Sequence, residues 1–231
     1  MHESSSRTPE LRWVRPPRQA RSQDTLDRLL DAAEGLVAER GFEDTTIAEL
    51  VRRADSSVGA FYARFRDKDS LLYALYERYL EQAMATTDVA LDPARWVISP
   101  ISEIVRKTVP FLVSVYRERR GLIRAFVLRN HIDAEFRARR ERLSHHVSEG
   151  LSRLLIARRS EIRHPNPVRA AVFGLTMVVN TIESAVLFGD LRSGALTLSD
   201  DELGVELTRA FLAYLGLDDF SRPRDPEPAE S

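Results

Sequence analysis

Apolar residues recur every three or four positions along most of the chain, which is the spacing of one face of an α-helix. This spacing predicts helices over residues 22–40, 46–54, 57–65, 67–86, 101–116, 122–130, 133–159, 167–188 and 199–215. Residues 190–197 are predicted to form a loop, and no segment alternates between apolar and polar residues as a strand would. The sequence therefore predicts an all-α fold.

The second and third predicted helices carry local signals for a tight helical corner. Thr46 and Glu49 have the spacing of a capping box, in which the hydroxyl accepts from the main chain of Glu49 and the carboxylate reaches back. The apolar pattern then breaks at Asp55, a residue type that tolerates the left-handed main chain of a corner. Either Ser56 or Ser57 can cap a new helix. These residues predict a helix, a turn and a second, short helix.

The third predicted helix is short and has two unlike sides. Its inward side is expected to hold Val58, Phe61, Tyr62 and Phe65. Its outward side is expected to hold small residues, which are Ser57, Gly59, Ala60 and Ala63. A short helix with a small, non-acidic outer side suits the major groove of DNA, where hydroxyls and apolar atoms can contact base edges and thymine methyl groups. The same spacing also fits an ordinary helical hairpin in a protein that never binds DNA.

The stretch from Thr46 to Leu72, preceded by Gly41 and Phe42, resembles the DNA-binding domain of the tetracycline-repressor (TetR) family of bacterial regulators. The resemblance covers about residues 20–75 and is carried by the segments SVGAFYARF and DKDSLL. It implies a recognition helix in the major groove, to which we assign Ser56, Ser57, Val58, Gly59 and Ala60. It also implies that DNA phosphates are contacted by Thr46, Tyr62 and Lys68.

Three positions depart from the family's pattern. Asp55 stands where glycine is usual, Ser56 stands where an apolar residue is usual, and Val51 replaces a small residue in the second helix. Asp55 places a negative charge near the DNA, so we expect it to weaken binding slightly. None of the three departures breaks the predicted geometry.

Polar and proline-rich segments divide the chain into five parts. We expect a flexible basic arm (1–20), a helix-turn-helix domain (21–66), a connecting helix (67–86), a larger helical effector-binding and dimerisation domain (87–217) and a disordered acidic tail (218–231). Arginines of an extended arm can pair with phosphates or enter a minor groove, and we assign this role to Arg15, Arg18 and Arg21. A solvated tail without a role in DNA binding is the alternative.

The family resemblance also implies a homodimer formed by the last two long helices, here residues 167–188 and 199–215. Two such helix pairs form a four-helix bundle. A two-fold dimer presents two recognition helices about 34–36 Å apart, which matches a palindromic operator of double-stranded DNA.

A helical pocket with few polar groups would suit a hydrophobic small-molecule effector. The polar residues expected to line such a pocket are Arg129, His131, Thr176, Asn180 and Glu183. For the last three, pairing with one another or across the dimer is the alternative, because buried polar groups need partners.

Composition and missing motifs narrow the choice of function. The 231 residues carry a net charge of −1 and no cysteine, so DNA binding must rely on local charge and no thiol chemistry is expected. The histidines lack HxxxH and HExxH spacing, and neither a GxSxG motif nor a glycine-rich phosphate loop occurs. We therefore expect no catalytic site, no metal and no cofactor.

The apolar stretch 170–188 is interrupted by polar residues, which favours a buried interface helix over a membrane span. The polar N-terminus shows no secretory signal.

Together these features predict a cytoplasmic, sequence-specific DNA-binding regulator, in the form of a dimeric repressor that a small molecule releases from its operator. A helical dimer that works through protein contacts, with the helix-turn-helix as scaffold, is the alternative from a different class. An activator, or a regulator without a small ligand, would share the same fold.

Overall fold

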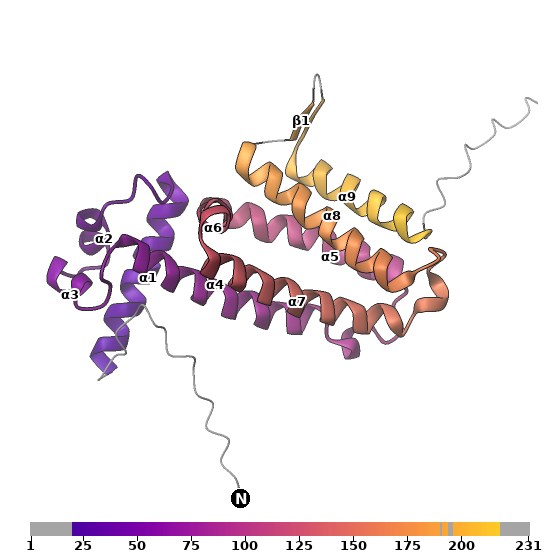
Figure 1. The fold of residues 1–231 in the computed structure, drawn as a ribbon, viewed down its shortest axis with the longest axis horizontal. Coiled ribbons are helices and arrows are strands. Elements are labelled where there is room, and N and C mark those ends of the chain that lie inside the picture. The colour runs from indigo at the N-terminus through magenta and orange to yellow at the C-terminus, as the bar shows by residue number, and fades with distance from the viewer. Residues whose placement is uncertain (1–19, 190, 194–195, 218–231) are drawn as a thin grey trace, which may run out of the picture. The chain divides into compact units, whose positions relative to one another are not determined.

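The computed structural model describes residues 20–189, 191–193 and 196–217, and within them the chain is mainly helical (Figure 1). The elements in chain order are α1 (Ala20–Arg40), α2 (Ile47–Arg53), α3 (Val58–Tyr62), α4 (Lys68–Ala90), η1 (Pro93–Trp96), α5 (Ile101–Glu118), α6 (Arg120–Ile132), α7 (Ala134–Ile156), η2 (Arg159–Glu161), α8 (Pro167–Phe188), β1 (Leu191–Ser193), β2 (Leu196–Leu198) and α9 (Asp200–Leu215). The predicted all-α class is confirmed. The predicted acidic tail and most of the predicted arm, with Arg15 and Arg18, lie outside the described residues.

Local capping interactions decide where several of these helices begin and end. Thr46 and Ser199 each begin a helix with a capping box, and the Ser57 side chain caps α3. Gly41 and Gly216 follow the ends of α1 and α9 with φ angles of 86° and 73°, a conformation that glycine adopts without steric cost. The caps predicted at Thr46 and at one of the two serines, here Ser57, are therefore confirmed, as are the helix ends predicted at residues 40 and 215.

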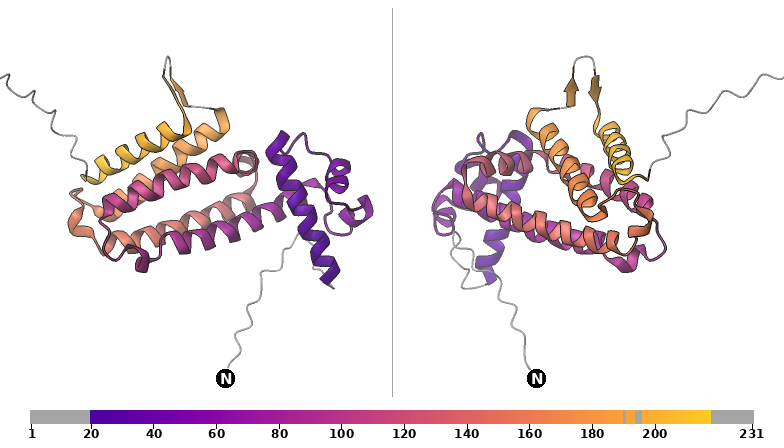
Figure 2. Two further views of the ribbon diagram at one scale, coloured as in Figure 1. Left: turned by 180° about the vertical axis from the view of Figure 1, so that it is seen from behind. Right: turned by 45° about the vertical axis from the view of Figure 1, so that its right-hand side comes forward.

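The connection between α8 and α9 differs from the prediction. The sequence predicts a loop over residues 190–197 and no strand, but β1 and β2 form an antiparallel hairpin there (Figure 2). Leu191 pairs with Leu198, and Ser193 pairs with Leu196. Each strand has three residues, which is too short for an alternation of apolar and polar positions to stand out in the sequence. The prediction is therefore wrong at this connection.

The described residues form two compact units, and each unit draws on separate stretches of the chain. Unit 1 contains residues 20–83 and 119–139, and unit 2 contains the described residues of 84–118 and 140–217. The helices α4 and α7 each supply residues to both units. The domain ranges expected from the sequence are continuous stretches of the chain, whereas each unit combines two separate stretches. These ranges stay predictions.

Unit 1 packs α6 and the first turns of α7 together with α1 to α4. Its fully buried aromatic residues are Phe61, Phe65, Phe126 and Phe136. Tyr76 on α4 stacks on two of them, with ring centroids 4.4 Å from Phe126 and 4.8 Å from Phe136. Gly121 on α6 lies so close to α1 that an added Cβ would be 2.5 Å from the Val37 oxygen. The sixth helix is therefore an integral part of the unit that contains α2 and α3.

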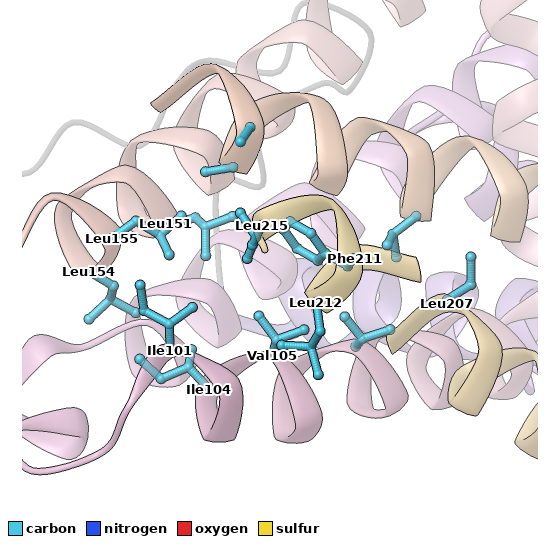
Figure 3. Packing of buried hydrophobic residues seen from close by; sticks show 14 of the residues in the cluster. Ile101, Ile104, Val105, Leu151, Leu154, Leu155, Leu207, Phe211, Leu212 and Leu215 are labelled. Carbon is cyan, nitrogen blue, oxygen red and sulfur yellow. The ribbon is translucent and has the colours of Figure 1, made fainter. Parts of the chain in front are cut away.

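Unit 2 is built around α5, α8 and α9. Figure 3 shows its apolar core, whose labelled members are Ile101, Ile104, Val105, Leu151, Leu154, Leu155, Leu207, Phe211, Leu212 and Leu215. Gly174 permits α8 to approach α9 closely, because a Cβ at this position would lie 2.2 Å from the Phe211 ring. Pro110 lies inside α5, as the sequence predicts.

The helix α8 has one buried side and one exposed apolar side. Its 22 residues include a window of mean hydropathy 1.7, which by length and composition alone would suffice to cross a membrane. The buried side contributes Ala170, Ala171, Val178 and Ile182 to unit 2. The exposed side includes Val168, Val172 and Phe173, of which Phe173 is 55% exposed. A helix that is apolar on both sides needs cover on the second side as well.

Candidate DNA-binding site

The helix α2 begins with the capping box that the sequence predicts. The Glu49 N–H donates to the Thr46 hydroxyl at 3.3 Å, and that hydroxyl donates to Glu49 Oε2 at 2.8 Å. Arg40 Nη1 donates to the other carboxylate oxygen at 2.5 Å. The hydrogen bond from the Thr46 hydroxyl is the main cause of a lowered pKa of Glu49, and Arg40 adds to it. Thr46 itself is exposed at the start of α2, where a phosphate can approach main-chain N–H groups.

The corner between α2 and α3 contains a left-handed residue at Asp55. Its φ angle is +45°, and its main-chain oxygen accepts a hydrogen bond of 3.0 Å from Arg28 Nη1 on α1. The Ser56 N–H donates to the Val51 oxygen at 2.8 Å, which closes the corner. The Asp55 carboxylate is fully exposed. The tolerance of a left-handed main chain expected for this residue is confirmed, and its charge stands at the surface of the corner.

The helix α3 is oriented by two phenylalanines. Phe61 and Phe65 are both 0% exposed, with ring centroids 5.2 Å apart. The sequence also predicts Val58 and Tyr62 on the inward side, but these residues are 48% and 51% exposed. That part of the prediction is wrong because α3 has five residues, little more than one turn of about 3.6 residues, so spacing alone cannot choose its buried side.

The outer side of α3 is open and uncharged. The Ser57 hydroxyl accepts from the Ala60 N–H at 3.0 Å and so holds the first turn. An added Cβ at Gly59 would meet no atom closer than Ser57 Oγ, at 3.8 Å. The segment from Ser57 to Ala63 contains no charged side chain and no side-chain amide. Another molecule can therefore approach the main chain of α3 closely, without a fixed charge to pair.

The first residue of α4 is the cation Lys68, which belongs to unit 1 together with α2 and α3. Asp67 caps the helix, since its Oδ1 accepts from the Ser70 N–H and from the Ser70 hydroxyl, each at 2.7 Å. The hydroxyl bond is the main cause of a lowered pKa of Asp67. Lys68 Nζ donates to the Glu43 oxygen at 2.8 Å and lies 4.5 Å from the centre of the Phe42 ring. An ammonium has three donors, so Lys68 can bind a phosphate and keep its bond to Glu43.

A polar cluster that the sequence analysis missed joins α6 to α4 within unit 1. Arg129 forms an ion pair with Asp69 in the first turn of α4, and its Nε lies 3.8 Å from Asp133 Oδ2. The Tyr73 hydroxyl donates to the same Asp133 oxygen. Burial first, and then this hydrogen bond, raises the pKa of Tyr73 to about 12. Partners 60 residues apart leave no signal in local spacing, so sequence reasoning had no means to find them.

Two of the predicted pocket residues lie in unit 1. Arg129 belongs to the polar cluster just described, and His131 is exposed near the end of α6. Asn130, between them, is 8% exposed, and its side-chain oxygen has no hydrogen-bond partner among the described residues. Arg129 therefore does not point into a pocket as a cation, but joins α6 to α4 through its ion pair with Asp69.

The other three predicted pocket residues lie on α8 in unit 2. Thr176 and Asn180 are on its exposed side, and Glu183 pairs with Arg140, whose Nη2 lies 2.6 Å from Oε2. A surface depression of about 320 Å³ in unit 2 is lined by other residues, which are Val97, Ile98, Ser99, Pro100, Ala157, Arg158 and Glu161. A shared effector pocket for the five residues stays a prediction.

Comparison with known protein sequences agrees with this geometry. Residues 29–75, which run from within α1 into α4, match the family model described as "Bacterial regulatory proteins, tetR family". An uncharacterized HTH-type transcriptional regulator of Mycobacterium tuberculosis, Rv2250c, is 28% identical over 197 residues, which cover 83% of this chain and 95% of that protein. An uncharacterized HTH-type transcriptional regulator of Bacillus subtilis, YerO, is 28% identical over 107 residues, which cover 46% of this chain but only 36% of that protein.

Solved structures show that the fold is shared beyond the matched segment. A TetR-family regulator from Mesorhizobium loti is similar with a TM-score of 0.68 and 17% identity, over 86% of this chain and 98% of the other. The regulator FadR from Bacillus subtilis, solved in complex with stearoyl-CoA, is similar with a TM-score of 0.57 and 18% identity, over 82% of this chain and 96% of the other. With a capped helix-turn-helix at the residues matched by the family model, these similarities support a TetR-family transcriptional regulator.

Proposed function

We propose that this regulator is a cytoplasmic repressor that binds a palindromic operator as a homodimer and leaves it when a hydrophobic small molecule binds. The observation that carries the proposal is the outer side of α3, which is exposed, uncharged and held in place by two buried phenylalanines. A short helix of this kind, braced by a second capped helix, fits the major groove. We assign the groove contacts to Ser56, Ser57, Val58, Gly59 and Ala60.

We assign the phosphate contacts to Thr46, Tyr62 and Lys68. Each carries a hydrogen-bond donor, and the Lys68 ammonium adds a positive charge. Tyr62 is half exposed, and Thr46 stands at the start of α2. The arginines assigned to the arm add cations on the N-terminal side of this domain, namely Arg15, Arg18 and Arg21. Phosphate contacts of this kind set affinity and register without selecting a sequence.

We assign the dimer interface to the exposed apolar side of α8 together with α9. This side includes Val168, Val172 and Phe173 on α8 and Val205 on α9, each of them 37% exposed or more. Packing against the same helices of a second copy would cover these side chains in a four-helix bundle. On this assignment, Thr176 and Asn180 on the same side of α8 face the partner.

The effector is assigned to a class of compound and not to a defined site. FadR from Bacillus subtilis, which has a similar fold, was solved with stearoyl-CoA, a molecule with a long apolar chain. The apolar core of unit 2 suits a ligand of that character. To release the operator, the ligand must bind the released state more tightly, and about 1.4 kcal/mol of coupling changes operator affinity tenfold.

Selection of random duplex DNA on the purified protein, sequenced and repeated at several salt concentrations, tests the DNA-binding proposal. We expect enrichment of one palindrome, with an affinity whose logarithm falls linearly with the logarithm of salt concentration. A folded dimer that enriches no sequence at any salt concentration would contradict the proposal and favour action through protein contacts.

A reporter promoter overlapped by the selected palindrome then separates repression from activation. We expect lower expression when the regulator is present; higher expression would contradict the repressor assignment. Titration of the protein–operator complex with stearoyl-CoA tests the effector class, with release of labelled DNA as the expected result.

A further inference from the structure

Val58 has an apolar side chain on the outer side of α3, outside the hydrophobic core. It is 48% exposed, whereas the burial that anchors the helix comes from Phe61 and Phe65. The adjacent Gly59 leaves open space beside it. A half-exposed valine on an open helical surface adds little to stability, and its apolar side chain is free to contact a molecule bound at that surface.

The side chains that usually distinguish bases are missing from this segment. Arginine or lysine recognises guanine, asparagine or glutamine recognises adenine, and a carboxylate accepts from cytosine. From Ser57 to Ala63 the sequence is SVGAFYA, which contains none of them. The Ser57 hydroxyl already accepts from the Ala60 N–H, and its remaining O–H can donate to acceptors on several bases. Since Tyr62 is assigned to a phosphate, the discriminating contact left to α3 is apolar.

Thymine is the base that offers an apolar group in the major groove, its 5-methyl group. We propose that Val58 is the residue by which α3 determines specificity, and that it packs against the 5-methyl group of one thymine in each half of the operator. The proposal rests on the proposed DNA-binding function and deepens it. It predicts half-sites in which α3 covers a thymine and in which no guanine contact by α3 is required.

Replacing thymine by deoxyuridine removes the 5-methyl group alone and leaves base pairing and charge unchanged. In the selected palindrome, each thymine is replaced in turn, once in one half-site only and once in both half-sites. The dissociation constant of the protein is measured for each duplex. We expect one position per half-site at which the replacement weakens binding about fourfold, since a buried methyl group contributes about 0.8 kcal/mol. The symmetric replacement is expected to weaken binding about 15-fold.

The matching protein change is Val58→Ala. It removes the two methyl groups of Val58 that would contact the thymine methyl group, so we expect the variant to bind the thymine and deoxyuridine duplexes with nearly equal affinity. Val89→Ala is the control, because Val89 is also an exposed valine (60%) and lies on α4 in unit 2. We expect this variant to keep the fourfold preference for thymine.

Three outcomes overturn the inference. If no thymine replacement weakens binding of the natural sequence, the 5-methyl group is not recognised, although the proposed DNA binding stands. If Val58→Ala keeps the full preference for thymine, another residue recognises the methyl group. If the selection enriches no palindrome, the proposed function and this inference both fail, and the failure is visible before any base is replaced.

Discussion

Arg28 on α1 donates a hydrogen bond from Nη1 to the main-chain oxygen of Asp55, 3.0 Å away, and so ties the first helix to the corner of the helix-turn-helix. Asp55 holds a φ angle of +45° at that corner. A left-handed conformation costs a residue with a side chain about 1–2 kcal/mol, less for aspartate, whose side chain can bond locally. The corner therefore keeps a strained, negatively charged residue close to the proposed DNA surface.

Replacing Asp55 by glycine is expected to improve both stability and DNA binding. Glycine relieves the strain, and the Arg28 bond survives because it uses a main-chain oxygen. We expect the free energy of unfolding in urea to rise by about 0.5–1 kcal/mol. Loss of the exposed carboxylate should tighten operator binding about two- to threefold at low salt, and the gain should shrink as salt screens the charge.

Asp55→Asn is the control for these two effects. Asparagine also tolerates the left-handed conformation, so this variant removes the charge and leaves the backbone preference unchanged. We expect it to match Asp55→Gly in operator affinity but not in stability. Equal affinity of all three proteins would show that the Asp55 carboxylate lies too far from the DNA to matter.

Gly59→Ala is expected to separate folding from binding. The nearest atom to an added Cβ is 3.8 Å away, so the protein has room for it, and helix propensity should raise the free energy of unfolding by about 0.5–1 kcal/mol. In the complex, the same methyl group would stand between α3 and the bases. We expect operator affinity to fall at least tenfold, measured by fluorescence anisotropy, while the circular dichroism spectrum stays unchanged. Unaltered affinity would mean that α3 does not approach DNA through this side.

Gly121→Ala should have the opposite effect on stability. Its added Cβ would lie 2.5 Å from the Val37 oxygen and 3.2 Å from the Ala38 Cα, and main-chain atoms of α1 cannot give way as a flexible side chain can. Overpacking of this kind costs about 1–3 kcal/mol. We therefore expect the midpoint of urea unfolding to fall. A midpoint as high as that of the natural sequence would contradict the close packing of α6 on α1.

Features set by neighbouring residues were predictable from the sequence, and features set by packing were not. The capping box of Thr46 and the glycine stop at Gly41 depend on residues a few positions apart, and both are present in the structure. The burial of Phe61 was also predicted. The exposure of Val58 was not, because a helix of five residues has too few turns for spacing to define a face.

Contacts between distant segments lay beyond any spacing rule. Arg129 is an ordinary surface cation in the sequence, and only the fold brings it to Asp69, 60 residues away. The assignment of Arg129 to an effector pocket came from its place at the end of the sixth predicted helix, and that place alone does not reveal an ion pair. The β1–β2 hairpin was missed for the same reason, since pairing of two three-residue strands is decided by their neighbours in space.

Tyr73→Phe tests the polar cluster through the pH dependence of stability. Removing the hydroxyl takes a donor from the partly buried Asp133, so we expect a loss of about 1 kcal/mol at pH 7. The folded-state pKa of Tyr73, about 12, exceeds its ordinary value of 10.0, so protonated Tyr73 stabilises the fold fully below pH 10. That contribution is lost as pH rises from about 10 to 12, and the difference in unfolding free energy between natural and variant proteins should shrink over this interval. A difference that stays constant up to pH 12 would contradict the bond to Asp133.

Phe173→Asp tests the proposed dimer interface. Phe173 is 55% exposed, and its ring lies 5.3 Å from that of Tyr214, so its removal should leave unit 2 folded. In a two-fold dimer, the variant would bury two like charges in an apolar interface, which costs several kcal/mol. We expect sedimentation to show a monomer and operator affinity to fall at least 100-fold, because each half-site is then bound separately.

The matched control for Phe173→Asp is Leu128→Asp, since Leu128 is 49% exposed on α6 in unit 1. It introduces the same charge at a similarly exposed apolar residue outside the proposed interface, so a dimer with natural operator affinity is expected. If Phe173→Asp also remains dimeric, the exposed side of α8 is not the interface. If both variants become monomeric, the added charge acts without regard to position, and the assignment to α8 and α9 loses its support.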